Sequence, residues 1–227
     1  MLSLHYASID PHSRFVRLIL AEYGLETELI EERLSERRRE LLEFNPSGAL
    51  PVLRDDGAVI SGANVIADYL DETRGQDMGS RRLLPANPVE RAEVRRLLHW
   101  FNGKFYDEVT SYLVTEKFIK RARIGADAAP DVSAIRAAKT NIRYHLRYIS
   151  HLVSKRDFLG GDWLSFADFA AAAHLSSADY FGDVPWDEEL GAKSWFARIK
   201  SRPGFRPLLS ERIPGMEPPA HYADLDF

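Results

Sequence analysis

Residues able to carry out covalent or metal chemistry are scarce in this sequence. The 227-residue chain contains no cysteine, which excludes thiolate nucleophiles, disulfides and thiolate metal sites. Its seven histidines show no HExxH spacing, and the sequence contains neither a glycine-rich phosphate loop nor a GxSxG motif. We therefore expect no metal site and no cofactor, so that any chemistry would depend on hydroxyl, carboxylate and backbone groups.

The polar groups nearest the N-terminus follow a short alternating segment, residues 2–6, which predicts a strand. Asp10 and Pro11 then form a helix-start signal. An aspartate at the N-cap accepts a backbone N–H, and a proline in the first turn loses no hydrogen bond. Capping therefore explains Asp10 without any catalytic role, while Ser13 lies in the first turn of the same predicted helix.

The C-terminal segment 221–227, HYADLDF, combines acidic and large apolar side chains. Apolar anchors concentrate binding energy at protein interfaces, and charges beside them steer the encounter with the partner. The pattern is typical of a short binding motif, although a tail packed on its own domain and a frayed end are both alternatives. The predicted partner-binding residues are Tyr222, Asp224, Leu225, Asp226 and Phe227.

The composition is that of a folded globular protein, with 45% hydrophobic and 28% charged residues. A formal net charge of -4 argues against a protein built to bind nucleic-acid backbones. No apolar stretch is long enough for a signal peptide or a membrane span, so we expect a cytoplasmic protein without membrane insertion.

The periodicity of the first third of the chain predicts the strands and helices that carry the N-terminal polar groups. It predicts strands at 2–6, 27–31, 50–53 and 58–61, and helices from 11 to a stop at Gly24, at 33–43 and at 63–73. This β-α-β-α-β-β-α order is that of a thioredoxin-like domain.

Beyond a Gly-, Ser-, Arg- and Pro-containing stretch, every strong signal is helical. Apolar residues recur at helical spacing from Leu97 to Leu113 and from Ile135 to Ile149. Ser165 and Asp168 form a capping box before the apolar run 169–175, which predicts a buried central helix. The predicted division is a thioredoxin-like domain at 1–75, a linker at 76–88, an all-helical domain at 89–209 and a tail at 210–227.

Five segments in the same order along the chain resemble the glutathione-transferase superfamily, and the likeness extends from about residue 2 to residue 205. They are PHSRFVRL at 11–18, NPSGALPVL at 45–53, IADYL at 66–70, LSFAD at 164–168 and the segment 195–205, which ends in RPGF. The resemblance implies that Pro51 forms a cis peptide bond that directs the backbone of Leu50 at a bound thiol peptide.

The chain departs from this family at the glutathione carboxylate. Members that use glutathione hold its γ-glutamyl carboxylate with an acidic residue or Gln followed by Ser, and the matching positions here are Gly62 and Ala63. The N–H of Ala63 can still meet an anion at a helix start. The missing hydroxyl alone costs a charge-assisted hydrogen bond, worth about 1.5 to 3 kcal/mol.

The chain also departs at the thiol. In the bacterial members that the resemblance suggests, the residue before the first-helix proline is the Cys or Ser that meets the sulfur, and here it is Asp10. A carboxylate cannot donate to a thiolate, and its charge would raise the pKa of the thiol. Ser13, Tyr6 and Ser8 are the remaining candidate donors.

The loss of both ends of the glutathione site favours a binding protein. With its DLDF-type terminus, the chain resembles the FtsZ-binding, transferase-like cell-division factors of alphaproteobacteria, which implies a non-catalytic homodimer whose partner is the FtsZ filament. One alternative is a glutathione-dependent transferase or isomerase acting on a small electrophile. Another is an adaptor of the stringent-starvation type.

Overall fold

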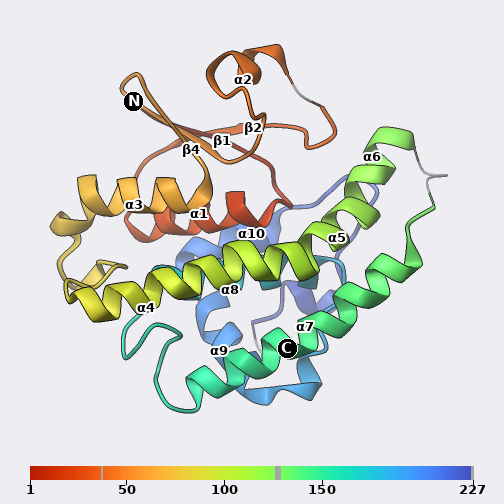
Figure 1. Ribbon diagram of the computed structural model, residues 1–227. Coiled ribbons are helices and arrows are strands. Elements are labelled where there is room, and N and C mark those ends of the chain that lie inside the picture. Colours follow the sequence, from red (N-terminus) through yellow and green to blue (C-terminus); the bar gives the residue numbers. More distant parts are fainter. Residues whose placement is uncertain (37, 126–128, 226–227) are drawn as a thin grey trace.

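The computed structural model describes residues 1–36, 38–125 and 129–225 of the chain. The N-terminal part forms a four-stranded sheet in the order β2-β1-β3-β4 (Figure 1). β1 (Leu2–Tyr6) is parallel to β2 (Glu28–Glu31) and antiparallel to β3 (Val52–Asp55), which pairs antiparallel with β4 (Ala58–Ser61). This mixed sheet confirms the thioredoxin-like prediction.

The sheet is covered by helices on both sides. α1 (Pro11–Glu22) and α3 (Ala63–Arg74) lie between the sheet and the helical second half of the chain, whereas α2 (Arg39–Phe44) lies beyond the sheet (Figure 1). α1 packs against α8 (Phe166–Tyr180), which is buried along its whole length. The start of α1 therefore faces the helical half, where the two parts of the core meet.

The second half of the chain is helical, as predicted. Its elements are the 3-10 segment η1 (Gly75–Arg81), α4 (Pro88–His99), the π-type segments η2 (Trp100–Thr110) and η3 (Thr115–Ile119), α5 (Ser111–Val114), α6 (Lys120–Ile124), α7 (Val132–Val153), η4 (Trp186–Glu188), α9 (Leu190–Lys200), η5 (Pro203–Phe205), α10 (Arg206–Ser210) and η6 (Ala220–Tyr222). The boundaries between domains, linker and tail remain predictions.

The predicted helix at 33–43 is wrong in its start, because α2 begins at Arg39; residue 37 lies outside the described residues. The backbone of Arg38 is extended, and its guanidinium donates to both carboxylate oxygens of Glu32 at 2.7 and 2.5 Å. Glu32 also pairs with His5 at 2.7 Å. The buried carboxylate of Glu32 therefore holds the exposed Arg38 at the end of β2, and α2 begins only after it.

The long helix from α4 to α6 buries the predicted apolar stripe. Leu97, Phe101, Phe105, Val109 and Leu113 are all at most 1% exposed. The hydrogen bonding widens to the π type in η2 and η3, a feature that an apolar stripe does not reveal.

The capping box before α8 is confirmed, and its aspartate does more than cap. Asp168 accepts from the N–H of Ser165 at 3.0 Å, from the hydroxyl of Ser165 at 2.9 Å and from the N–H of Leu159 at 2.9 Å. It also accepts from the indole N–H of Trp195 at 3.0 Å. Asp168 therefore joins the loop before α8 to α9 inside the core.

His145 in α7 is buried beneath Trp100 and is held as a neutral ring. The indole N–H of Trp100 donates to its Nδ1 at 3.1 Å, so the ring proton lies on Nε2 and is donated to Glu108 at 3.1 Å. Burial lowers the pKa of His145 from 6.5 to about 4, although the Glu108 carboxylate opposes this shift.

This arrangement predicts a loss of stability in acid. Between the two pKa values the unfolded chain binds more protons than the folded one, so the stabilisation present above pH 6.5 is lost as the pH falls towards 4. His145→Gln, which keeps an acceptor for Trp100, should reduce the difference in free energy of unfolding between pH 7 and pH 4.5 by roughly 2 to 3 kcal/mol. Urea titrations at the two pH values measure this difference in free energy of unfolding. His151→Gln, at an exposed position of the same helix, should retain the full pH dependence, and an unchanged dependence in His145→Gln would contradict the assignment.

Within the described ranges, no helix combines the length and the apolar character needed to cross a lipid bilayer.

Candidate functional site

The start of α1 is organised around an internal hydrogen-bond cluster. Asp10 caps the helix by accepting from the N–H of Ser13 at 2.7 Å and from its hydroxyl at 2.6 Å, and the Ser13 oxygen accepts from the N–H of Ala7 at 3.2 Å. Both side chains are buried, and burial raises the pKa of Asp10 despite these contacts and the nearby cation of Arg14. The predicted capping role is confirmed, and the hydroxyl of Ser13 is already used inside the protein.

The second part of the site is formed by the turn between α2 and β3 together with the start of α3. The Leu50–Pro51 peptide bond is cis, as the resemblance implies. Gly62 precedes α3 with φ of 93°, a left-handed conformation that favours glycine, so a side chain at this position would strain the backbone. Ala63 begins the helix and presents no polar side chain. The structure thus brings Leu50, Gly62 and Ala63 together around one cavity of about 330 Å³.

The imidazole ring of His12 lines this cavity. Its Nε2 lies 2.8 Å from the carbonyl oxygen of Asn102, which can only accept, so Nε2 carries the proton. Its Nδ1 lies 4.0 Å from Asp10. Asn64 and Asn102 complete the polar lining, and the Asn102 amide donates to Asn64 at 2.6 Å.

A buried histidine continues this network into α8. Thr110 contacts Nδ1 of His174 at 2.8 Å, and Nε2 of His174 contacts the side-chain oxygen of Asn102 at 3.1 Å. Burial and the neighbouring His12 hold the pKa of His174 well below its usual range, so the ring is neutral. The ordered contacts from Thr110 to Asn64 fix α8, η2 and the start of α3 relative to one another.

Sequence reasoning missed His12, Asn64, Asn102 and His174. One signal was available for His174, because a polar ring inside the alanine-rich run of a buried helix needs hydrogen-bond partners. No signal pointed to Asn64 or Asn102, since their meeting depends on how the two halves of the chain pack together.

The tail is fastened to the core by Tyr222, which is 1% exposed. Its hydroxyl accepts from Arg14 at 3.1 Å and donates to the carbonyl of Leu208 at 3.1 Å. Arg14 is itself fully buried and also donates to the carbonyl of Ser8 at 2.7 Å and to Ser176 at 3.0 Å. The expectation that Tyr222 contacts a partner does not agree with this burial; Tyr222 is an internal anchor of the tail.

The tail is also held by side chains of α8 and α9. The Lys200 ammonium donates to the carbonyl oxygens of His221 at 3.1 Å and Asp224 at 2.5 Å. The His221 ring lies 3.0 Å from the buried carboxylate of Asp179. The tail is therefore docked on its own domain at least as far as Asp224.

The remaining tail predictions divide in two. Asp224 and Leu225 are exposed, with Leu225 at 41%. Asp226 and Phe227 lie outside the described residues. Among the described residues, no group of three or more His, Asp or Glu side chains is arranged to hold a metal ion.

Comparisons with known proteins agree with this geometry. The family model "Glutathione S-transferase, N-terminal domain" matches residues 11–73. FtsZ-localized protein A from Caulobacter vibrioides is 46% identical over 230 residues, covering 99% of this chain and 98% of that protein. The crystal structure of a glutathione S-transferase from Sinorhizobium meliloti superposes with a TM-score of 0.95 at 48% identity over the whole of both chains. The structure of FzlA from C. crescentus gives a TM-score of 0.92 at 46% identity, covering 100% of this chain and 99% of that one.

Proposed function

The chain belongs to the glutathione S-transferase family, and we propose that it is a non-catalytic member that binds FtsZ filaments and regulates bacterial cell division. The proposal draws on similarity to a relative that is named for its localisation with FtsZ and matches over almost the whole length of both proteins. It also draws on the presence of Asp10 where the family has the residue that contacts the thiol.

The observation that carries the non-catalytic part is the hydrogen-bond cluster at the start of α1. A transferase needs a donor that lowers the pKa of a bound thiol. The carboxyl group of Asp10 occupies the expected donor position, and the hydroxyl of Ser13 donates to Asp10 at 2.6 Å. Asp10 and Ser13 are buried and do not line the cavity, whereas Ala63 lines it and offers an incoming carboxylate only its backbone N–H.

We expect calorimetric titration to show no saturable glutathione binding below the millimolar range. The charge-assisted hydrogen bond that Ala63 cannot make is worth about 1.5 to 3 kcal/mol, or at least tenfold in affinity. Ala63→Ser should not restore turnover, because Asp10 would remain beside the sulfur.

A double variant sharpens this experiment. Asp10→Ser keeps an oxygen for capping while removing the carboxyl group, so Asp10→Ser combined with Ala63→Ser places a hydroxyl at each end without uncapping α1, while Gly62 is left unchanged. Micromolar affinity in the parent protein would disprove the non-catalytic proposal. Substantial turnover by Ala63→Ser alone would show that Asp10 is compatible with catalysis.

We further propose that the exposed end of the docked tail contacts the filament. Asp224 and Leu225 present a charge and an apolar side chain at neighbouring positions in the chain. The Lys200 ammonium holds the carbonyl oxygen of Asp224 and so fixes this segment on the core. A docked segment loses little conformational entropy on binding, which favours affinity. Co-sedimentation with FtsZ tests this contact directly.

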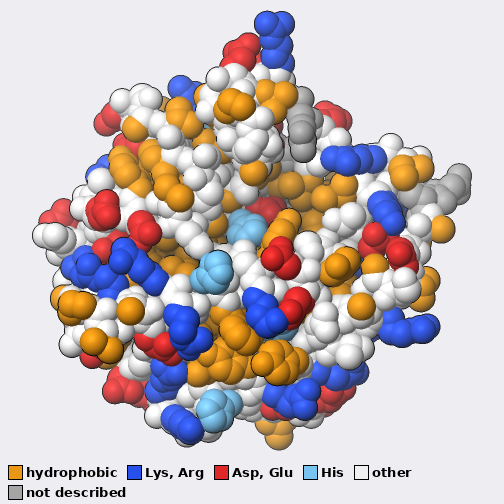
Figure 2. Space-filling model, viewed as in Figure 1, with side chains coloured by type: hydrophobic (Ala, Val, Ile, Leu, Met, Phe, Trp, Pro, Cys, Tyr) orange, Lys and Arg blue, Asp and Glu red, His pale blue; other side chains and the backbone are white. Residues whose placement is uncertain are grey.

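We also propose that the protein is a homodimer. Trp100, Tyr144 and Tyr148 form an aromatic cluster, with ring centroids 4.6 Å apart for Trp100 and Tyr148 and with Tyr144 51% exposed. An apolar patch rimmed by charged side chains lies between the long helix and α7 on the face shown in Figure 2. Such patches mark interaction surfaces.

Sedimentation should give a species near twice 25.8 kDa, and Tyr144→Glu should shift it to the monomer by placing a charge within the aromatic cluster. Tyr112→Glu is the matched control, because Tyr112 is 44% exposed but belongs to α5 outside the cluster. A dimer that survives Tyr144→Glu would move the interface elsewhere.

The alternative is a glutathione-dependent transferase or isomerase. It is favoured by the cavity at Leu50 and Ala63 and by the 48% identical Sinorhizobium meliloti protein, which is described as a glutathione S-transferase. The glutathione titration separates the two functions.

A further inference from the structure

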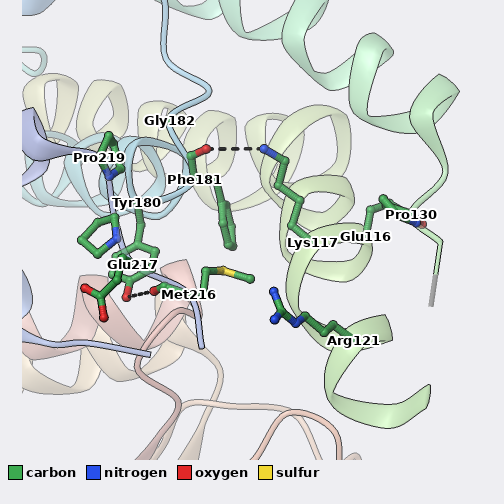
Figure 3. A pocket seen from close by; sticks show the side chains of 11 residues that line it. Glu116, Lys117, Arg121, Pro130, Tyr180, Phe181, Gly182, Met216, Glu217 and Pro219 are labelled. Atoms are coloured by element: carbon green, nitrogen blue, oxygen red, sulfur yellow. Dashed lines mark hydrogen bonds between the residues drawn. The ribbon is translucent and has the colours of Figure 1, made fainter. Parts of the chain in front are cut away.

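A second cavity, of about 580 Å³, lies between the long helix, the end of α8 and the tail (Figure 3). None of the residues that line the cavity at Leu50, Gly62 and Ala63 lines this one. Ligand pockets in proteins typically measure about 300 to 1,000 Å³ and combine apolar walls with a few polar groups. The cavity has the size and the mixed lining of a site for a small molecule.

The apolar wall is formed by Tyr180, Phe181, Met216 and two prolines of the tail. Tyr180 fixes this wall, because its hydroxyl accepts from the N–H of Ile213 at 2.8 Å and donates to the carbonyl of Met216 at 2.8 Å. Figure 3 shows the ring of Phe181 and the thioether of Met216 directed into the same space. A flat apolar group can therefore be covered from two sides.

The opposite wall is cationic. Lys117 pairs with the buried Asp183 at 2.5 Å, and Lys139 shares the same carboxylate at 3.2 Å. The guanidinium of Arg121 is directed towards Met216, and within the described parts of the chain it makes no hydrogen bond and no ion pair (Figure 3). Arg121 is thus a cation with free donors at the mouth of an apolar cavity.

The local charge balance favours an anion. The charged side chains that line the cavity, taken with the whole ion-pair networks to which they belong, give an excess of two positive charges, in a chain whose net charge is -4. The cations are Lys117, Lys120, Arg121, Lys139 and Arg212, and the anions are Glu116, Asp183 and Glu217.

We propose that this cavity binds a small amphipathic anion. Its carboxylate pairs with the planar guanidinium of Arg121, which matches the geometry of a carboxylate, and its aromatic body packs against Phe181 and Met216. The inference does not depend on the filament partner proposed above.

Occupancy of the site is linked to the docked tail, because residues 216–219 form one wall of the cavity. A ligand that contacts both the long helix and this segment binds the docked form in preference to an undocked one. By linkage it must stabilise docking to the same extent.

Calorimetry with 2-naphthoate and 2-naphthamide, which differ in charge but hardly in shape, tests the proposal. The parent protein should prefer 2-naphthoate, and Arg121→Gln should weaken 2-naphthoate at least tenfold while leaving 2-naphthamide unchanged. Arg123→Gln is the matched control, since Arg123 is exposed on the same helix but does not line the cavity. Met216→Ala should weaken both probes equally, because it removes an apolar contact that both probes share. The Met216 carbonyl that holds the tail is retained.

Three results would overturn the proposal: no binding of 2-naphthoate up to millimolar concentration, equal affinity in Arg121→Gln and Arg123→Gln, or an unchanged preference for the acid in Arg121→Gln. Melting temperatures of the variants, measured without probe, should match the parent because both arginines are exposed. The melting temperature of the parent should rise with 2-naphthoate concentration, and this rise should be lost in Arg121→Gln.

Discussion

Tyr222→Ala is expected to lower the free energy of unfolding by about 3 to 5 kcal/mol, the usual cost of removing a buried aromatic side chain. Tyr222 is 1% exposed, and its ring lies 5.1 Å from that of Tyr180. The loss would also deprive the buried Arg14 of a hydrogen-bond partner. For a chain of this size the melting temperature should fall by roughly 10 °C, measured by calorimetry.

Tyr222→Phe provides the matched comparison, because it removes only the hydroxyl that accepts from Arg14 and donates to Leu208. Its cost should be smaller, about 1 to 3 kcal/mol. If Tyr222→Ala melts at the same temperature as the parent, the tail is not part of the folded core.

Asp224→Lys should abolish most FtsZ binding, with at least a tenfold loss in co-sedimentation, while leaving the melting temperature nearly unchanged. The physical reason is that Asp224 is exposed, and substitutions at exposed positions usually change stability by about 0.5 kcal/mol or less. A reversed charge at a contact with a basic partner surface, by contrast, repels it.

Asp162→Lys makes the same change in net charge at an exposed position between α7 and α8, so it should bind FtsZ as the parent does. Asp224→Asn removes the charge without adding a second cation near Lys200 and should give an intermediate loss. Normal binding by Asp224→Lys would leave the tail without a role in partner recognition.

Much of the fold could be predicted from local signals. Asp10 before Pro11 predicted the start of α1, and the Ser165 and Asp168 pair predicted that of α8. The strand pattern at 58–61 predicted β4, while β3 runs from Val52 to Asp55 and not over 50–53. In each case the residues that decide the structure are neighbours in the chain. The start of α2 was missed because Arg38 pairs with Glu32, a contact that the charge pattern of 33–43 does not reveal.

The candidate site was less predictable, because contacts between distant segments decide it. The positions of Asp10, Gly62 and Ala63 followed from matching motifs, but the link from Asn64 through Asn102 to His174 joins three separate elements. The same limit applies to the tail. HYADLDF has the composition of a binding motif, yet Tyr222 is turned inward by Arg14, which lies 208 positions earlier in the sequence.

The position of Arg14 also determines how the molecule comes apart. One guanidinium on α1 holds the carbonyl of Ser8, the hydroxyl of Ser176 in α8 and that of Tyr222 in the tail. Undocking any one of these segments leaves a buried cation short of acceptors, so partial opening is costly. The two halves of the chain and the tail should therefore melt cooperatively, in a single heat-capacity peak with equal calorimetric and van't Hoff enthalpies.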